Sequence, residues 1–128
     1  GVGGSFSICT DFARKLTFLG KKAYARSDWD EQEAAVKNLD GQDLAIFVSY
    51  TGETKGILAY ARVAQEQQVP MISLISTKGS TLEKLSTTTL FAKGTTRYHQ
   101  RVDLSSRIAV ICLFDTVLLM YAEAKQPR

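Results

Sequence analysis

The sequence is poor in the residues on which several classes of function depend. Its 128 residues include one histidine, one tryptophan and two cysteines. The cysteines, Cys9 and Cys112, lie far apart, so with a single histidine they cannot supply the four ligands of a structural zinc site. Both have apolar neighbours and no C-x-x-C spacing, which favours buried thiols in a reducing compartment. We therefore expect no metal centre.

Long hydrophobic runs and blocks of like charge are also missing. The longest apolar run, 108–114, ends at Asp115 and is too short to span a bilayer. No signal-peptide pattern opens the sequence, so we expect a cytoplasmic protein with no membrane partner. The net charge of +3 is scattered, which favours an ordinary solvated surface over a nucleic-acid-binding one. Length and composition suit one globular domain over residues 1–128.

Helical and strand patterns alternate along the chain. Apolar spacings of three and four predict helices, whereas short apolar runs predict buried strands. The predicted helices cover 5–19, 30–39, 54–68, 80–85 and 104–123, and the predicted strands 22–26, 43–49, 69–76 and 88–93. Residues 95–101 are expected to form a loop. This order predicts an α/β fold of the doubly wound kind, a three-layer α/β/α sandwich around a parallel sheet. The last helix, apolar on most sides, should be buried or lie against a partner subunit.

The stretch SYTGETKG, 49–56, follows a predicted buried strand and opens a predicted helix. The first turn of a helix has unpaired N–H groups and a partial positive charge, so it favours anions. Hydroxyls from Ser49, Thr51 and Thr54 add donors, and Gly52 lets the backbone approach closely. A second glycine-rich turn, GVGGSFS at 1–7, also opens a helix. The two turns predict a phosphate cradle, although the hydroxyls could also serve only as helix caps.

The motifs of common nucleotide sites do not match. A dinucleotide fingerprint fails because Phe6 occupies the place of its third glycine, and no GK[ST] of a P-loop exists. SYTGET does fit the loop that holds the FMN phosphate in flavodoxins. It follows the wrong strand for that family, however, and the single Trp29 lies in a connector. We expect no cofactor and keep a flavin or nucleotide binder as an alternative.

Several segments together resemble the SIS (sugar isomerase) domain, in the form found at the C-terminal end of RpiR-type transcriptional regulators. The segments are GVGGS, DFARKLTFLGKKA, DLAIFVSYTGETKGIL, VPMISLIS, STLEKLS and SSRIAVICLFDTVL. The resemblance implies a five-stranded parallel sheet, a sugar-phosphate effector, and a homodimer or tetramer formed through helices. It also implies that the sheet's first strand and a DNA-binding helix-turn-helix domain precede Gly1 in the native protein.

The resemblance also implies a set of ligand-binding residues. The second loop would hold the phosphate with backbone N–H groups from Tyr50 to Thr54, and Ser5 would bind sugar hydroxyls or the phosphate edge. Residues at the start of the last helix would close the site, unless they form only a cap and a surface ion pair. The implied ligand-binding set is Gly4, Ser5, Ser49, Tyr50, Thr51, Gly52, Thr54, Ser105 and Arg107. The segment 98–107 departs from the family pattern, and STLEK departs because the family more often has proline after the serine.

An enzyme of this family would need a general base near the sugar. Glu53 lies inside the predicted phosphate loop, Glu66 and Glu83 have the spacing of solvated helix positions, and His99 lies in a predicted loop. These candidates are few, so the sequence favours a binding module and predicts no catalytic residue. A stand-alone sugar-phosphate isomerase remains the alternative.

Overall fold

A computed structural model of the chain describes residues 1, 4–94 and 97–125. The helices are α1 (Gly4–Phe18), α2 (Trp29–Lys37), α3 (Lys55–Glu66), α4 (Thr81–Leu85) and α5 (Ile108–Lys125). The strands are β1 (Ala45–Val48), β2 (Met71–Ile75), β3 (Thr88–Phe91), β4 (Tyr98–His99) and β5 (Val102–Asp103). No helix in the described part of the chain is long and apolar enough to cross a membrane.

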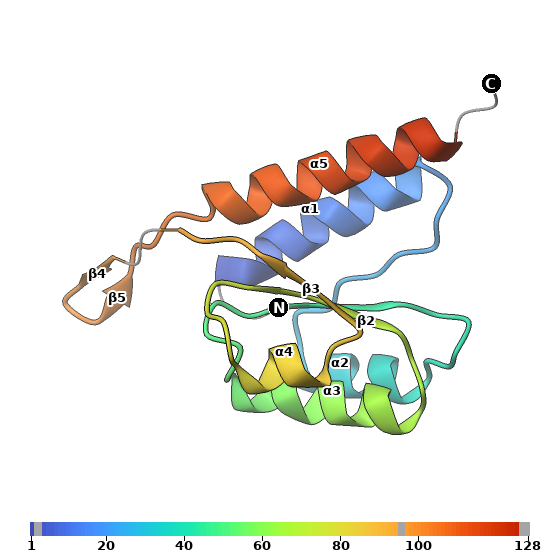
Figure 1. Cartoon of the computed structure of the whole chain (residues 1–128), viewed down its shortest axis with the longest axis horizontal. Coiled ribbons are helices and arrows are strands. Elements are labelled where there is room, and N and C mark those ends of the chain that lie inside the picture. Colours follow the sequence, from blue (N-terminus) through green and yellow to red (C-terminus); the bar gives the residue numbers. More distant parts are fainter. Residues whose placement is uncertain (2–3, 95–96, 126–128) are drawn as a thin grey trace.

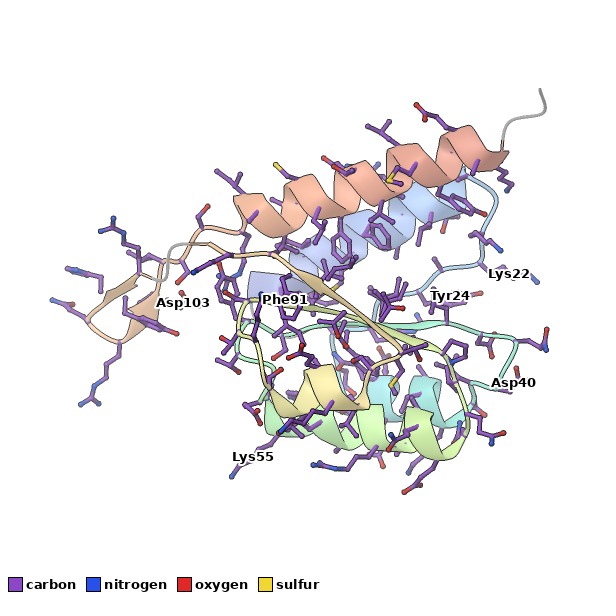
Figure 2. All side chains as sticks on the ribbon, viewed as in Figure 1. Lys22, Tyr24, Asp40, Lys55, Phe91 and Asp103 are labelled. Carbon is purple, nitrogen blue, oxygen red and sulfur yellow. The ribbon has the colours of Figure 1, made fainter. Side chains whose placement is uncertain are left out.

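The elements form three layers around a parallel sheet (Figure 1). Strands β1, β2 and β3 lie in that order, with Ala45 beside Met71 and Ile72 beside Thr88. Helices α1 and α5 cover one face, and α2, α3 and α4 cover the other. This arrangement confirms the predicted α/β/α sandwich. Charged side chains such as Lys22, Asp40 and Lys55 point outward to solvent (Figure 2).

Alternating residues of the strands build two separate cores. Phe47 and Ile75 point toward α3 and α4, where Ile57 and Leu82 are fully buried. The next residues along the same strands, such as Leu74, pack instead with α1 and α5. Side chains of a strand alternate between faces, so runs that are apolar throughout require a helix layer on each side.

The core between the sheet and α1 and α5 centres on an aromatic pair. The rings of Phe12 and Phe114 stack with their centroids 4.1 Å apart. Helix α1 ends as predicted, because Gly20 adopts a φ of +88°, the left-handed conformation of a helix-terminating glycine. Lys15 of α1 also forms an ion pair with Asp115 of α5 at 3.1 Å, which joins the two helices.

Three sequence-based predictions about secondary structure are wrong. Residues 22–26 form no strand, because among the described residues β1 has β2 as its hydrogen-bonded neighbour and no ladder reaches this segment. The predicted loop 95–101 contributes β4 to an antiparallel hairpin with β5, although residues 95–96 lie outside the described part. The last helix begins at Ile108 rather than at 104, because Ser106 accepts a hydrogen bond from the Ile108 N–H at 3.3 Å.

Candidate functional site

The loop 49–54 lies where the sheet ends and several helices begin. It connects the last residue of β1, Val48, to the first residue of α3, Lys55. The N-terminal ends of α1, α3, α4 and α5 all lie toward this end of the molecule, as Figure 1 shows. In parallel sheets, ligands bind beyond the carboxyl ends of the strands, so this is the expected position of a binding site.

Hydroxyl groups hold the loop in a fixed shape. Ser49, only 4% exposed, accepts a hydrogen bond from the Gly52 N–H at 3.1 Å. Its Oγ also lies 2.9 Å from Oγ1 of Thr54. The exposed Thr51 accepts the Glu53 N–H at 3.0 Å. Thr54 is the N-cap of α3, but its side chain makes no capping bond to that helix. The first turn of α3 therefore has no side-chain cap from Thr54, and its N–H groups can serve a ligand.

Gly52 allows the loop to pack closely against the start of α4. Its φ is +72°, and a Cβ at this position would overlap Oγ of Ser80 and lie 2.5 Å from the Ser80 Cβ. The Gly52 carbonyl accepts the Leu82 N–H at 3.1 Å. Glycine is required here for two reasons, the left-handed backbone and the absence of space for a side chain.

Glu53 joins the loop to α4 as well. Its Oε1 accepts the Thr81 backbone N–H at 2.7 Å and the Thr81 hydroxyl at 3.0 Å. These two bonds favour the charged form and lower the pKa of Glu53. The carboxylate thus binds the N-terminal end of α4.

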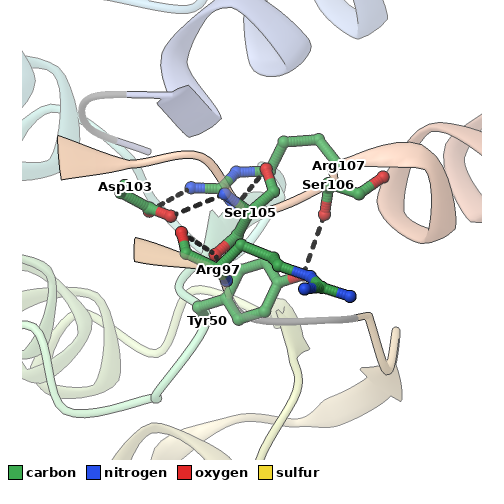
Figure 3. A network of polar contacts seen from close by, with 6 residues as sticks. All are labelled: Tyr50, Arg97, Asp103, Ser105, Ser106 and Arg107. Atoms are coloured by element: carbon green, nitrogen blue, oxygen red, sulfur yellow. Dashed lines mark hydrogen bonds and ion pairs between the residues drawn. The ribbon is translucent and has the colours of Figure 1, made fainter. Parts of the chain in front are cut away.

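Tyr50 joins the loop to the segment before α5 (Figure 3). Its hydroxyl donates to the Ser106 carbonyl at 3.0 Å, and the Arg107 guanidinium carbon lies 4.7 Å from the centre of its ring. Arg107 forms an ion pair with Asp103 at 2.9 Å. Tyr50 therefore has two partners from a distant segment, the Ser106 carbonyl and the Arg107 guanidinium.

The structure brings together most of the predicted site residues. Tyr50 of the loop contacts the segment that contains Ser105 and Arg107, although both precede α5 rather than lie within it. Ser5 is buried in the first turn of α1, which begins at Gly4. The rest of the turn 1–7 includes residues 2–3, which lie outside the described part, so the predicted second cradle stays a prediction.

Sequence reasoning missed four residues that support the site. Ser80 and Thr81 hold the loop against α4, Gly94 leaves room for the Tyr50 hydroxyl, and Asp103 holds Arg107. Ser80 also caps α4, since it accepts the Glu83 N–H at 3.3 Å as in a capping box. Its contact with Gly52 has no sequence signal. Asp103 had one, since Asp two residues before a serine is typical of an Asx-turn.

Comparison with known proteins gives the family. The model of the SIS domain family matches residues 1–117. A curated relative, an uncharacterized HTH-type transcriptional regulator of Thermotoga maritima, is 30% identical over 129 residues, which is 100% of this chain and 45% of the relative. The chain thus spans about half the length of the curated relatives that it matches.

Solved structures share the fold over nearly the whole chain. The Vibrio vulnificus NanR protein complexed with ManNAc-6P has a TM-score of 0.84 and 27% identity, covering 98% of this chain and 47% of that one. The sugar isomerase domain of an RpiR transcription factor from Sphaerobacter thermophilus also has a TM-score of 0.84, with 22% identity, covering 98% and 68%. With the family model matched from residue 1 to residue 117, the chain belongs to the SIS domain family.

Proposed function

We propose that this chain is the effector-binding domain of a transcriptional regulator and that its effector is a sugar phosphate. The relatives' description as HTH-type transcriptional regulators supports the first part. DNA binding would belong to a helix-turn-helix domain elsewhere in the whole protein, which would act in the cytoplasm. The binding of ManNAc-6P by the structurally similar NanR supports the second part.

The observation that carries the proposal is the geometry of loop 49–54. The phosphate would lie at the N-terminus of α3, where Thr54 leaves the first turn uncapped by its side chain. Backbone N–H groups of Tyr50 to Thr54 and the exposed hydroxyl of Thr51 would bind its oxygens. The N–H groups of Gly52 and Glu53 now donate to Ser49 and Thr51, so these two would share their hydrogen bonds with the ligand. Ser49 would hold Thr54 in place, since their hydroxyl oxygens lie 2.9 Å apart. No charged side chain is needed for this mode of binding, because the helix end supplies partial positive charge.

The remaining predicted residues would contact the sugar. Ser5 and Gly4, at the start of α1, would bind its hydroxyl groups. Ser105 and Arg107 would close the site from the segment before α5, where Tyr50 already contacts Ser106 and Arg107. As the structure stands, the Ser105 hydroxyl accepts the Arg97 N–H at 2.8 Å and Arg107 pairs with Asp103, so both would contact a ligand through the donors that these bonds leave over.

Sugar phosphates should stabilise the chain against heat while their parent sugars do not. We expect N-acetylmannosamine 6-phosphate or arabinose 5-phosphate, the ligands of two structural neighbours, to be informative members of a thermal-shift panel. A ligand at a hundredfold over its Kd adds about 2.7 kcal/mol to the free energy of unfolding. Inorganic phosphate tests the cradle alone, and FMN tests the flavin alternative. A stabilising effect of FMN or of the parent sugars alone would contradict the proposal.

The isomerase alternative lacks support at the loop. A general base works best with a pKa near the operating pH. The hydrogen bonds from Thr81 lower the pKa of Glu53, so this carboxylate is poorly suited to remove a proton from a sugar. His99, the other candidate base, is exposed in the β4–β5 hairpin and does not belong to the loop 49–54.

We also propose that a second copy of the chain covers the exposed face of α5. This helix exposes several large apolar side chains to solvent, namely Ile108, Ile111, Leu119 and Met120. Exposed apolar side chains gathered on one helix are typical of an interface. Leu118 of the same helix is only 7% exposed and belongs to the core, so it is not part of this face.

Leu119→Glu should weaken self-association by about tenfold or more, because a charge would be buried at the interface. Leu119 is 66% exposed, so the fold of the single chain should be preserved. Tyr24→Glu is the matched control, since Tyr24 is 72% exposed and lies outside α5. Sedimentation equilibrium of the three proteins measures the effect. Equal association of Leu119→Glu and the wild type would rule out this face as the interface.

A further inference from the structure

The Tyr50 side chain extends from the loop 49–54 and packs against residues that are distant in sequence. Its hydroxyl donates to the Ser106 carbonyl, and a Cβ on Gly94 would overlap that hydroxyl and lie 3.3 Å from the same carbonyl oxygen. The position of the ring therefore depends on a glycine after β3 and on the backbone just before α5. A shift of the loop backbone at Tyr50 would therefore disturb the hydrogen bond between its hydroxyl and the Ser106 carbonyl.

Arg107 lies over this ring, and one of its hydrogen-bond donors has no partner among the described residues. Its side chain is 19% exposed, and its guanidinium pairs with Asp103 at 2.9 Å. Its Nε is buried and has no hydrogen-bond partner among the described residues. A buried donor without a partner raises the free energy of the arrangement. The position of Arg107 thus depends on the Tyr50 ring, the Asp103 carboxylate and the Ser105 carbonyl, which accepts a hydrogen bond from Nη1 at 3.4 Å.

Asp103 carries the connection into the β4–β5 hairpin. Its Oδ1 accepts the Ser105 N–H at 2.9 Å, and the Ser105 Oγ accepts the Arg97 N–H at 2.8 Å. The Leu104 N–H donates to the Arg97 carbonyl at 2.7 Å, which closes the base of the hairpin. Hydrogen bonds from Ser105, and then from Arg107, lower the pKa of Asp103 to about 2, so the carboxylate is charged at neutral pH.

Within the described residues, the hairpin itself is very short. Each strand has two residues, and both Gln100 and Arg101 have positive φ values, of 46° and 68°, as in a type I′ turn. It projects from the body of the molecule in Figure 1, with Tyr98 and Val102 exposed. A two-stranded ribbon of this size is marginally stable by itself. Its order therefore depends on the contacts at its base.

We propose that Tyr50, Arg107 and Asp103 link the loop 49–54 to the β4–β5 hairpin, so that an anion bound in the loop orders the hairpin. This inference rests on the proposed function, because it takes the loop as the phosphate site. An anion bound to backbone N–H groups fixes the loop, and with it the ring of Tyr50. The fixed ring holds Arg107 over it and keeps Asp103 and the base of the hairpin in place. Binding at one site thereby reduces motion at another without a new contact.

Amide hydrogen exchange followed by NMR tests the link residue by residue. Inorganic phosphate, and in parallel the panel compound with the largest thermal shift, are added until the thermal shift saturates. Exchange at the N–H groups of Arg97, Leu104 and Ser105 should slow about fivefold or more in the wild type. In Asp103→Asn the thermal shift with inorganic phosphate, which needs the loop 49–54 alone, should persist while this slowing is lost. The neutral amide cannot form the ion pair with Arg107 but can still accept the Ser105 N–H.

Two further variants make the test specific. Gly94→Ala should also abolish the slowing, since its methyl group displaces the Tyr50 hydroxyl. Glu33→Gln removes an ion pair of the same i,i+4 spacing, that of Glu33 with Lys37, and should leave the slowing unchanged. Unchanged exchange in the wild type despite a thermal shift would overturn the link alone, as would full slowing in Asp103→Asn. The absence of a thermal shift with every phosphate compound would overturn the proposed function and the link together.

Discussion

Replacing Thr51 with aspartate is expected to weaken phosphate binding by about 30-fold or more while leaving the fold intact. Thr51 is exposed in the loop 49–54, and its Oγ1 accepts the Glu53 N–H at 3.0 Å. Aspartate can accept the same N–H two residues on, so the turn is preserved. It also adds a negative charge to the site where an anion is proposed to bind.

The size of this effect follows from electrostatics. Two like charges about 4 Å apart repel by about 1 kcal/mol in bulk water and about 4 kcal/mol at the effective dielectric constant near a protein surface. A cost of about 2 kcal/mol corresponds to about a 30-fold rise in Kd. A dianionic phosphate would raise the cost further. Isothermal titration calorimetry with the best sugar phosphate of the panel measures the change.

Thr51→Asn is the matched control, because it has nearly the same shape and the same acceptor but no charge. Its side-chain amide can donate to the phosphate in place of the threonine hydroxyl, so it should bind within a few-fold of the wild type. If Thr51→Asp binds as well as the wild type, the phosphate does not lie in the loop 49–54. If asparagine weakens binding as much as aspartate, the cause is the loss of the threonine hydroxyl and not charge repulsion.

Gly52→Ala is expected to lower the free energy of unfolding by about 2–5 kcal/mol, the sum of two costs. A left-handed backbone costs an L-residue about 1–2 kcal/mol, and overpacking typically costs about 1–3 kcal/mol. Gly52 incurs both, because its φ is +72° and a Cβ there would overlap Ser80 and lie 3.1 Å from Ile75. This loss is large against a total stability of about 5–15 kcal/mol for a typical domain.

Gly79→Ala separates the two costs. Gly79 has a φ of +80°, yet a Cβ there meets nothing within 4 Å, so only the backbone cost applies. Urea unfolding of the two variants should therefore give a clearly larger loss for Gly52→Ala. Because the overlap pushes the loop away from α4, Gly52→Ala should also reduce phosphate affinity, whereas Gly79→Ala should not. Equal losses of stability would mean that the loop moves away from Ser80 without cost.

Much of the fold could be predicted because local patterns and tertiary packing agree. The apolar runs 43–49 and 69–76 contain β1 and β2, and the run 88–93 contains β3. Each predicted helix range overlaps a helix of the structure, and Gly20, which follows the first range, has the left-handed backbone of a helix end. Each of these signals reflects burial of one residue's side chain or the geometry of one turn. Such information is contained in a few consecutive residues.

The errors occurred where an element depends on distant partners or lacks a sequence signal. The segment 22–26 has a strand-like composition, but a strand exists only where another pairs with it. The β4–β5 hairpin turns at Gln100 and Arg101, without the glycine or asparagine that usually indicates a type I′ turn. The apolar pattern of the last helix continues back to Leu104, yet Ser106 ends it by bonding to the Ile108 N–H.

By itself, the sequence determined the layered fold, the position of the loop 49–54 at the end of a buried strand, and the hydroxyl and glycine residues that shape it. Only the tertiary structure decided what surrounds that loop. Ser80 against Gly52, Thr81 against Glu53, and Ser106 and Arg107 against Tyr50 are contacts across about 28 to 57 residues of sequence. Hydrophobic periodicity depends on each residue's neighbours along the chain, whereas these contacts depend on how separate helices and strands end at one edge of the sheet.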